Sequence, residues 1–360
     1  MRMKNKLAVK NLVVSYKTPE GRVQAVRDIS FVLKKRETLA LVGESGCGKS
    51  ATAKALLGVL AENALIEGGS VFYENKDLLQ MSEKDLCEIR GDKISMIFQD
   101  PVSCLDPVMR VGRQLTETIL VKAKRGRKSG EKSILTKAAA KSRAICLMKE
   151  VGISDAESCY NKYPFELSGG MCQRIAIAIA LANDPEVLIC DEPTTALDVT
   201  IQAQILELLR KLKEERGLSI IFITHDLGVV ANMADRVAVM YAGKIVEIGT
   251  CEDIFYTPAH PYTWALLTAM PDLETKGKLE AIPGTPPDMI SPPIGDAFAE
   301  RNPYALKIDY EMQPPMFQIS ETHAAATWLL HPDAPGAKPP KSVTERIKRM
   351  RKQGGACDET

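Results

Sequence analysis

The segment Gly43-Glu44-Ser45-Gly46-Cys47-Gly48-Lys49-Ser50 decides the fold of this chain. It matches the pattern G-x-x-x-x-G-K-[ST], between an apolar strand predicted over residues 37–42 and a helix predicted over residues 49–60. Its glycines permit backbone angles that strain other residues, and they let amide N–H groups approach an anion closely. The start of the helix adds further N–H groups and the positive end of its dipole. The segment therefore predicts a loop that holds nucleotide phosphates in an α/β fold.

Two side chains at the end of this loop supply charge and metal binding. Lys49 is placed to pair with the β- and γ-phosphates, and the hydroxyl of Ser50 is placed to bind Mg²⁺. The ligand that the pattern predicts is a magnesium-bound nucleotide.

Acidic residues follow a second buried strand, predicted at Val187-Leu188-Ile189-Cys190. Asp191 lies at the strand end, where open α/β sheets place ligand-binding groups, and its carboxylate suits Mg²⁺. Glu192 comes next and can polarise an attacking water. A third strand, over residues 219–224, is followed by His225. A lone histidine is more often structural, but its place after a strand favours contact with a γ-phosphate.

A third motif, Leu167-Ser168-Gly169-Gly170-Met171, precedes an apolar helix. Ser168, Gly169 and Gly170 can present a hydroxyl, bare backbone and a helix N-terminus to an anion. The simpler interpretation is a helix cap at Ser168. Both interpretations use the same N–H groups, so they are compatible.

The composition narrows the class of protein. The formal net charge of +1 implies no global field for nucleic acid. Nine cysteines without a Cys-x-x-Cys pair favour a reducing compartment over disulfides or structural zinc. We expect no signal peptide, because residues 1–6 lead directly into a strand-like segment. The longest apolar run, residues 175–182, is far short of the ~20 residues of a membrane span, so a transport role would need separate membrane subunits.

Together these segments resemble the ATP-binding subunit of an ABC transporter, over about residues 6–255. The resemblance implies an α/β P-loop NTPase fold: a RecA-like core, an antiparallel β-subdomain and a helical subdomain at about residues 102–170. We expect this ABC ATP-binding domain at residues 1–255, an irregular C-terminal extension at 256–335, and a basic, flexible tail at 336–360. The cofactors implied are ATP and Mg²⁺.

The resemblance also assigns roles to single residues. Tyr16 takes the place of the aromatic that stacks on adenine, and Gln99 that of the glutamine that contacts Mg²⁺ and reports to the membrane subunits. Asp191 is the metal carboxylate, Glu192 the catalytic carboxylate, and His225 the switch histidine; Ser50 completes the metal-binding set. The loop Thr195-Ala196-Leu197-Asp198 crosses a dimer interface in the family. The nucleotide-binding positions are Tyr16, Gly43, Glu44, Ser45, Gly46, Cys47, Gly48, Lys49, Ser50, Ala51, Ser168, Gly169, Gly170 and Asp198.

The proline-rich region beyond residue 255 resembles the C-terminal extension of peptide- and nickel-importer ATPases, through Ile282-Pro283-Gly284-Thr285-Pro286-Pro287. Many relatives hold an iron–sulfur cluster there with four cysteines. The aligned positions in this chain are Asp296, Asn302, Asp309 and Thr327. No cysteine occurs between Cys251 and Cys357, so we expect no iron–sulfur cluster.

The function implied is that of the ATPase of an oligopeptide importer, most like an oligopeptide-permease D-type subunit. It would act at the cytoplasmic face of the membrane with two polytopic permease subunits, a second ABC ATPase as heterodimer partner and an extracytoplasmic peptide-binding protein. Dipeptide or nickel import is the alternative. A soluble ABC ATPase of DNA repair or translation would carry a long coiled-coil insertion or two fused ATPase domains, and a drug exporter its own membrane helices. The sequence shows none of these, and nucleic acid is not an expected partner.

One basic segment has two interpretations. Residues 121–143 contain nine lysines and arginines against one acid, Glu131. Contact with anionic lipid headgroups is one interpretation, and a solvated helix and loop is the simpler one.

Overall fold

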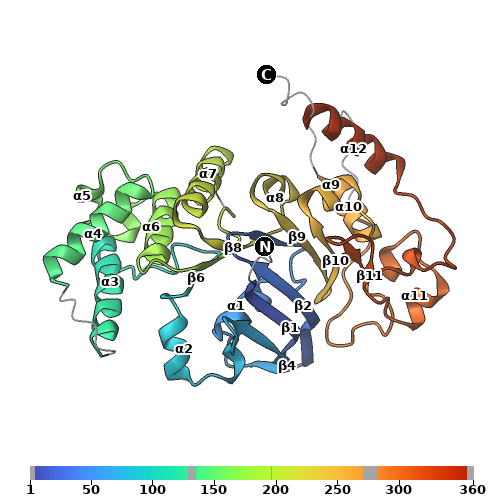
Figure 1. Ribbon diagram of the computed structural model, residues 1–360, viewed down its shortest axis with the longest axis horizontal. Helices are drawn as coiled ribbons and strands as arrows, with labels where there is room; N and C mark the ends of the chain where they lie inside the picture. Colours follow the sequence, from blue (N-terminus) through green and yellow to red (C-terminus); the bar gives the residue numbers. More distant parts are fainter. Residues whose placement is uncertain (1–4, 129–134, 196, 271–281, 355–360) are drawn as a thin grey trace. The chain divides into compact units, whose positions relative to one another are not determined.

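The computed structural model describes residues 5–128, 135–195, 197–270 and 282–354 (Figure 1). The chain divides into two compact units, and each is described by itself. Unit 1 comprises Met1–Lys6, Leu33–Glu37 and Gln80–Ile223. Unit 2 comprises Leu7–Val32, Thr38–Leu79 and Thr224–Thr360.

An antiparallel sheet in the order β2-β1-β4-β5 occupies the N-terminal part of the chain. Residues facing the core alternate along its first strand, and the alternation shifts where a β-bulge interrupts the pairing between Lys10 and Val13. Asn11, with a φ of 49°, lies at that bulge. The expected antiparallel β-region is therefore present. Its strands are β1 (Asn5–Thr18), β2 (Gly21–Lys34), β4 (Ala64–Tyr73) and β5 (Lys76–Asp77).

The second sheet of unit 2 contains the strand that leads into the glycine-rich loop. Its strands are β3 (Thr38–Val42), β9 (Arg236–Tyr241), β10 (Lys244–Thr250), β12 (Ala324–Ala325) and β11 (Phe317–Gln318). β3 pairs in parallel with β9, and β9 and β10 form a hairpin through Ala242 and Gly243, which both have positive φ. β12 pairs with β10, so the proline-rich region adds short strands to this sheet.

Unit 2 also contains α-helices and short 3-10 turns, and a glycine ends the first helix. The helices are α1 (Lys49–Leu57), α8 (Leu227–Met233), α9 (Cys251–Tyr256), α10 (Pro261–Ala269), α11 (Lys307–Glu311) and α12 (Lys341–Gly354), with 3-10 turns η3 (Ala299–Arg301) and η4 (Trp328–Leu330). α1 ends three residues before the predicted residue 60, because Gly58 adopts a left-handed φ of 62° and its N–H bonds back to Ala55 O.

Part of the segment that the sequence predicts as a basic, flexible tail is helical. Residues 341–354 form α12, which lies beside α10 (Figure 1). Val343 is fully buried in the core of unit 2, and Arg346 Nη1 donates to the carbonyl oxygens of Leu267 (2.6 Å) and Met270 (2.7 Å). These two carbonyls lie at the C-terminal end of α10, where a cation is favourable. α12 is therefore attached to unit 2 through Val343 and Arg346.

Unit 1 combines three parallel strands with helices. The strands β6 (Ile94–Ile97), β7 (Val187–Asp191) and β8 (Ser219–Thr224) pair in the order β6-β7-β8 and are buried along their whole length. This explains their continuous apolar sequences. The helices are α2 (Glu83–Ile89), α3 (Val111–Lys128), α4 (Lys137–Glu150), α5 (Ala156–Cys159), α6 (Gly169–Leu181) and α7 (Val199–Arg216); 3-10 turns are η1 (Leu78–Gln80), at the boundary of the units, and η2 (Pro164–Glu166).

The helices α3, α4 and α5 form the mostly helical region that the sequence predicts before Ser168, and α3 and α4 pack on each other and on α6 (Figure 1). Part of the basic segment is engaged locally: the Lys141 ammonium lies 5.0 Å from the Tyr160 ring centroid, and Arg143 pairs with Asp184. The side chains of residues 125–134 lie outside the described part of the chain. Among the described residues, no helix combines the length and apolar character that a membrane span requires.

Replacing Val343 by Asp is expected to release α12 from unit 2, because a carboxylate would then be buried without a partner. Losing about 2 kcal/mol of apolar packing would raise the amide exchange rate of residues 341–351 roughly 30-fold in hydrogen–deuterium exchange. Lys348→Asp introduces the same charge at an exposed position of the same helix and should change exchange little. Fast exchange of this segment in the unsubstituted protein would contradict the packing.

Candidate nucleotide-binding and catalytic site

The glycine-rich loop of unit 2 is closely packed against neighbouring backbone. β3 is fully buried and delivers the chain to Gly43. A Cβ atom on Gly43 would overlap the carbonyl oxygen of Met240, and one on Gly48 would overlap that of Ala25. Gly48 also has a φ of 104°, which side chains rarely tolerate. The loop therefore needs glycine at both positions for steric reasons alone.

Lys49 places its ammonium group inside this loop. Its Nζ donates to the carbonyl oxygens of Gly43 (2.7 Å) and Glu44 (2.9 Å), and the residue is 5% exposed. Burial raises the pKa of the Cys47 thiol, which lies 3.7 Å from Nζ, so the thiol stays neutral. The buried Lys49 ammonium group therefore links the start of α1 to the first two residues of the loop.

Four further predicted site residues lie in the loop itself or in the first turn of α1. Ser45 and Gly46 form the exposed tip of the loop, while Ser50 and Ala51 are half-buried in the first turn of α1. Gly48 is the N-cap of α1 and has no side chain with which to cap the helix. This leaves the helix start to backbone N–H groups, which suit an anion.

Tyr16 and His225, which the sequence predicts to contact the nucleotide, also belong to unit 2. Tyr16 is half-buried on β1 opposite Ala64 of β4, and burial raises the pKa of its hydroxyl. His225 is exposed and follows β8 directly.

In unit 1 the predicted catalytic carboxylate is oriented by two donors. Glu192 Oε2 accepts hydrogen bonds from Thr195 Oγ1 (2.8 Å) and Gln99 Nε2 (3.2 Å). The Glu192 N–H donates to Ile223 O (3.0 Å), and its φ of 48° is uncommon for a residue other than glycine. Asp191 precedes it at the buried end of β7. The structure thus brings Gln99 and Glu192 together, and Thr195 joins them.

The anion site predicted at Ser168 lies in unit 1, where the starts of two helices come together. Ser168 caps α6 by accepting from Met171 N (3.3 Å), and Asp198 caps α7 by accepting from Ile201 N (2.9 Å). The two caps are close, because a Cβ on Gly170 would lie 2.8 Å from Ile201 Cγ2, and one on Gly169 3.9 Å from Leu197. The cap predicted at Ser168 is confirmed. Ala196, between Thr195 and Leu197, lies outside the described residues.

Sequence reasoning missed the residues that contact Glu44 from far along the chain. Tyr262 OH accepts from Glu44 N (2.9 Å), and Arg301 forms an ion pair with the Glu44 carboxylate. Neither residue lies in a recognisable motif, and no local signal could have identified them.

The four positions that align with cluster cysteines hold buried oxygen-bearing side chains. Each accepts a nearby backbone N–H: Asp296 from Phe298 N (3.1 Å), Asn302 from Tyr304 N (2.9 Å), Asp309 from Leu306 N (2.6 Å) and Thr327 from Leu329 N (3.3 Å). These side chains therefore fix local turns of the extension. Within the described ranges, no group of three or more His, Cys, Asp or Glu side chains is arranged to hold a metal ion.

Protein-family models match parts of this chain. The ABC transporter family model matches residues 26–195, and the model of the oligopeptide/dipeptide transporter C-terminal region matches residues 246–308. The oligopeptide transport ATP-binding protein OppD of Bacillus subtilis (strain 168) is 54% identical over 353 residues, covering 97% of this chain and 96% of the relative. The dipeptide transport ATP-binding protein DppD of Lactococcus lactis subsp. cremoris (strain MG1363) is also 54% identical, over 97% of this chain and 98% of the relative.

Solved structures share the fold. The dimeric, post-hydrolysis state of the ATP-binding cassette MJ0796, bound to ADP and Pi, has a TM-score of 0.60 and 27% identity. The match covers 68% of this chain and 98% of that one.

Replacing Asp296 by Asn should stabilise the protein in a pH-dependent way. Burial raises the pKa of Asp296 to about 6, and the Asp309 carboxylate adds to the rise. The folded state therefore binds this proton more tightly than the unfolded chain, and stability falls as pH rises from about 4 to about 6. The cost of the ionised side chain above pH 6 is roughly 3 kcal/mol. Asn keeps the acceptor for Phe298 N without the charge.

Thermal unfolding followed at several pH values checks this expectation. The Asp296→Asn variant should melt higher than the unsubstituted protein at pH 7.5, and the two should converge near pH 4. Asp288→Asn is the matched control, since exposed Asp288 makes the same type of turn with Ile290 N. An equal effect of both substitutions would refute the assignment to burial.

Proposed function

We propose the function of this chain on the basis of its family. The chain belongs to the ABC transporter ATP-binding proteins that serve oligopeptide and dipeptide transport. It is an ATPase subunit of a peptide ABC importer, and its fold is the expected α/β P-loop ABC ATPase with a C-terminal extension. The observation that carries the function is the glycine-dependent loop around Lys49 in a chain that is 54% identical to such subunits over almost its whole length.

In unit 2, the loop residues would hold the triphosphate of ATP. Backbone N–H groups of residues 43–48 and the start of α1 would surround the phosphates, and Lys49 would exchange loop carbonyls for phosphate oxygens. Ser50 would bind Mg²⁺ and Tyr16 would stack on adenine. The loop fits this ligand, because backbone and a buried ammonium group line it where Cβ atoms at Gly43 and Gly48 would collide.

In unit 1, the oxygen ligands suit a hard cation and a water nucleophile. Asp191 would bind Mg²⁺ through its carboxylate, with Gln99 contacting the same ion. Glu192 would take a proton from the attacking water, and its hydrogen bonds from Thr195 and Gln99 fix the direction in which it points. Bound Mg²⁺ would neutralise charge on the phosphates, and these side chains would orient the water.

A second ABC ATPase subunit would complete the site. Ser168, Gly169 and Gly170, at the capped start of α6, would contact the γ-phosphate held by that subunit, with Asp198 beside them. We propose a heterodimer at the cytoplasmic face of the membrane, whose closure on ATP drives two permease subunits fed by an extracytoplasmic peptide-binding protein. His225 would contact the γ-phosphate within this closed form.

Relatives named for oligopeptide and for dipeptide transport are equally similar to this chain, so dipeptide import is the second candidate. The turn-forming side chains at Asp296, Asn302, Asp309 and Thr327 support an extension without an iron–sulfur cluster.

Lys49→Ala should abolish ATP binding, because it removes the buried ammonium group from the loop. Equilibrium dialysis with MgATP measures this directly. Lys54→Ala, on the same helix but outside the loop, should retain binding. Normal ATP affinity of the Lys49→Ala variant would refute the proposed site.

Glu192→Gln should leave ATP binding intact and slow hydrolysis by about 10²–10⁴-fold, the usual contribution of a positioned base. With ATP in excess, the closed dimer should then accumulate in size-exclusion chromatography with light scattering. Glu186→Gln is the control, since Glu186 pairs with Lys6 and Lys93 away from the predicted site residues. Unaltered turnover of the Glu192→Gln variant would remove Glu192 from the mechanism.

A further inference from the structure

We propose that Arg301 of the C-terminal extension is a positioning residue for ATP binding: it holds the phosphate loop through Glu44 and neutralises the charge of that carboxylate. The inference rests on the proposed function, because it concerns the loop that would bind ATP. It gives the extension a direct role in the nucleotide site.

The contact between Arg301 and Glu44 is bidentate and joins a buried arginine to a half-buried carboxylate. Arg301 Nη1 lies 2.7 Å from Glu44 Oε2, and Nη2 lies 3.0 Å from Oε1. The Arg301 side chain is 4% exposed and that of Glu44 is 28% exposed. A planar guanidinium that matches both carboxylate oxygens is the strongest form of this pairing.

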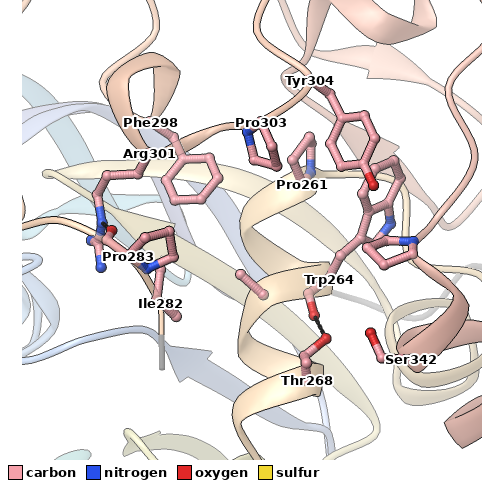
Figure 2. Close-up of a pocket in the computed structure, with 12 residues that line it drawn as sticks. Pro261, Trp264, Thr268, Ile282, Pro283, Phe298, Arg301, Pro303, Tyr304 and Ser342 are labelled. Atoms are coloured by element: carbon pink, nitrogen blue, oxygen red, sulfur yellow. Dashed lines mark hydrogen bonds between the residues drawn. The ribbon is translucent and has the colours of Figure 1, made fainter. Parts of the chain in front are cut away.

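Arg301 is itself fixed by the rest of unit 2. Its Nη1 also donates to Tyr241 OH (3.1 Å) at the end of β9, and its Nε donates to Pro283 O (2.7 Å). Figure 2 shows Arg301 beside Phe298 and Pro283, at one side of a pocket of about 140 Å³. Hydrogen bonding to Glu44 raises the pKa of the guanidinium, so Arg301 keeps its charge. The side chain cannot turn away without losing several partners.

The same loop residue is held a second time through its backbone. Glu44 N donates to Tyr262 OH (2.9 Å), and Tyr262 is fully buried in α10. The rings of Tyr241, Tyr262 and Phe298 pack on one another, with centroids 4.6–5.3 Å apart. An aromatic cluster therefore supports both contacts, and the second residue of the loop is fixed by side chain and main chain.

The charge of Glu44 explains why the contact matters for ATP. The Glu44 carbonyl oxygen accepts from Lys49 Nζ, so the carboxylate belongs to the loop that must receive an anion. Without Arg301, an unpaired carboxylate in the loop would repel the triphosphate and compete for Lys49. Pairing with Arg301 removes that repulsion.

The test compares Arg301→Met, Glu44→Gln/Arg301→Met and a matched control by equilibrium dialysis with MgATP and steady-state ATPase assays. Arg301→Met should raise the Kd and KM for ATP roughly tenfold and leave kcat within about twofold. The double variant lacks both charges but keeps the Glu44 main chain, which Tyr262 still holds, so its Kd should return to within about threefold of the unsubstituted protein. The control, Arg216→Met, breaks a similar bidentate pair with Glu150 in unit 1 and should lower the melting temperature without changing Kd.

A merely structural role would give a different pattern. If the double variant binds ATP as weakly as Arg301→Met, or if Arg301→Met binds ATP normally, the proposal is wrong. Should Arg301→Met fail to fold, Arg301→Lys takes its place, because lysine keeps the charge but not the bidentate geometry. An unchanged Kd of the Arg301→Lys variant for ATP, together with a double variant whose Kd is not restored, would also overturn the proposal. An unsubstituted protein that binds no MgATP would instead refute the proposed function.

Discussion

The close approach of backbone to backbone around residues 43–48 is the constraint on which the site depends. A loop that offers its N–H groups to an anion has no room for side chains, and here Gly43 and Gly48 lie against the carbonyl oxygens of Met240 and Ala25. Such a loop contributes little apolar packing of its own. It must be held by its surroundings, namely the buried strand β3 before it, α1 after it, and the lysine that folds back onto its carbonyl oxygens.

The side chains predicted to carry out hydrolysis are also held in place before any substrate binds. Glu192 has an uncommon positive φ and two hydrogen-bond donors on one carboxylate oxygen, so its direction is set before any substrate arrives. The helix starts at Ser168 and Asp198 are likewise capped and packed together. Both arrangements favour preorganised polar groups over mobile ones, which is what the transfer of a highly charged phosphoryl group requires.

Patterns confined to a short window predicted most of this architecture. The loop at residues 43–50, the strand before Asp191 and the cap at Ser168 each depend on neighbours in sequence. What the sequence could not show depends on distant partners. Val343 and Arg346 order α12 only because α10 provides an apolar surface and carbonyl acceptors. Arg301 reaches Glu44 across 257 positions, and a single arginine among prolines carries no local signature. The roles assigned to all the site residues remain predictions, including those of Tyr16, Asp191 and His225.

We propose that ATP bound to the loop of this chain is enclosed by a neighbouring ATPase subunit, and that this closure drives the membrane partners. The most direct measurement is a structure of the intact transport complex trapped with MgATP. We expect the triphosphate on residues 43–50, with the serine–glycine helix start of the neighbouring ATPase subunit against the γ-phosphate. A triphosphate bound away from this loop, or enclosed by this chain alone, would contradict it.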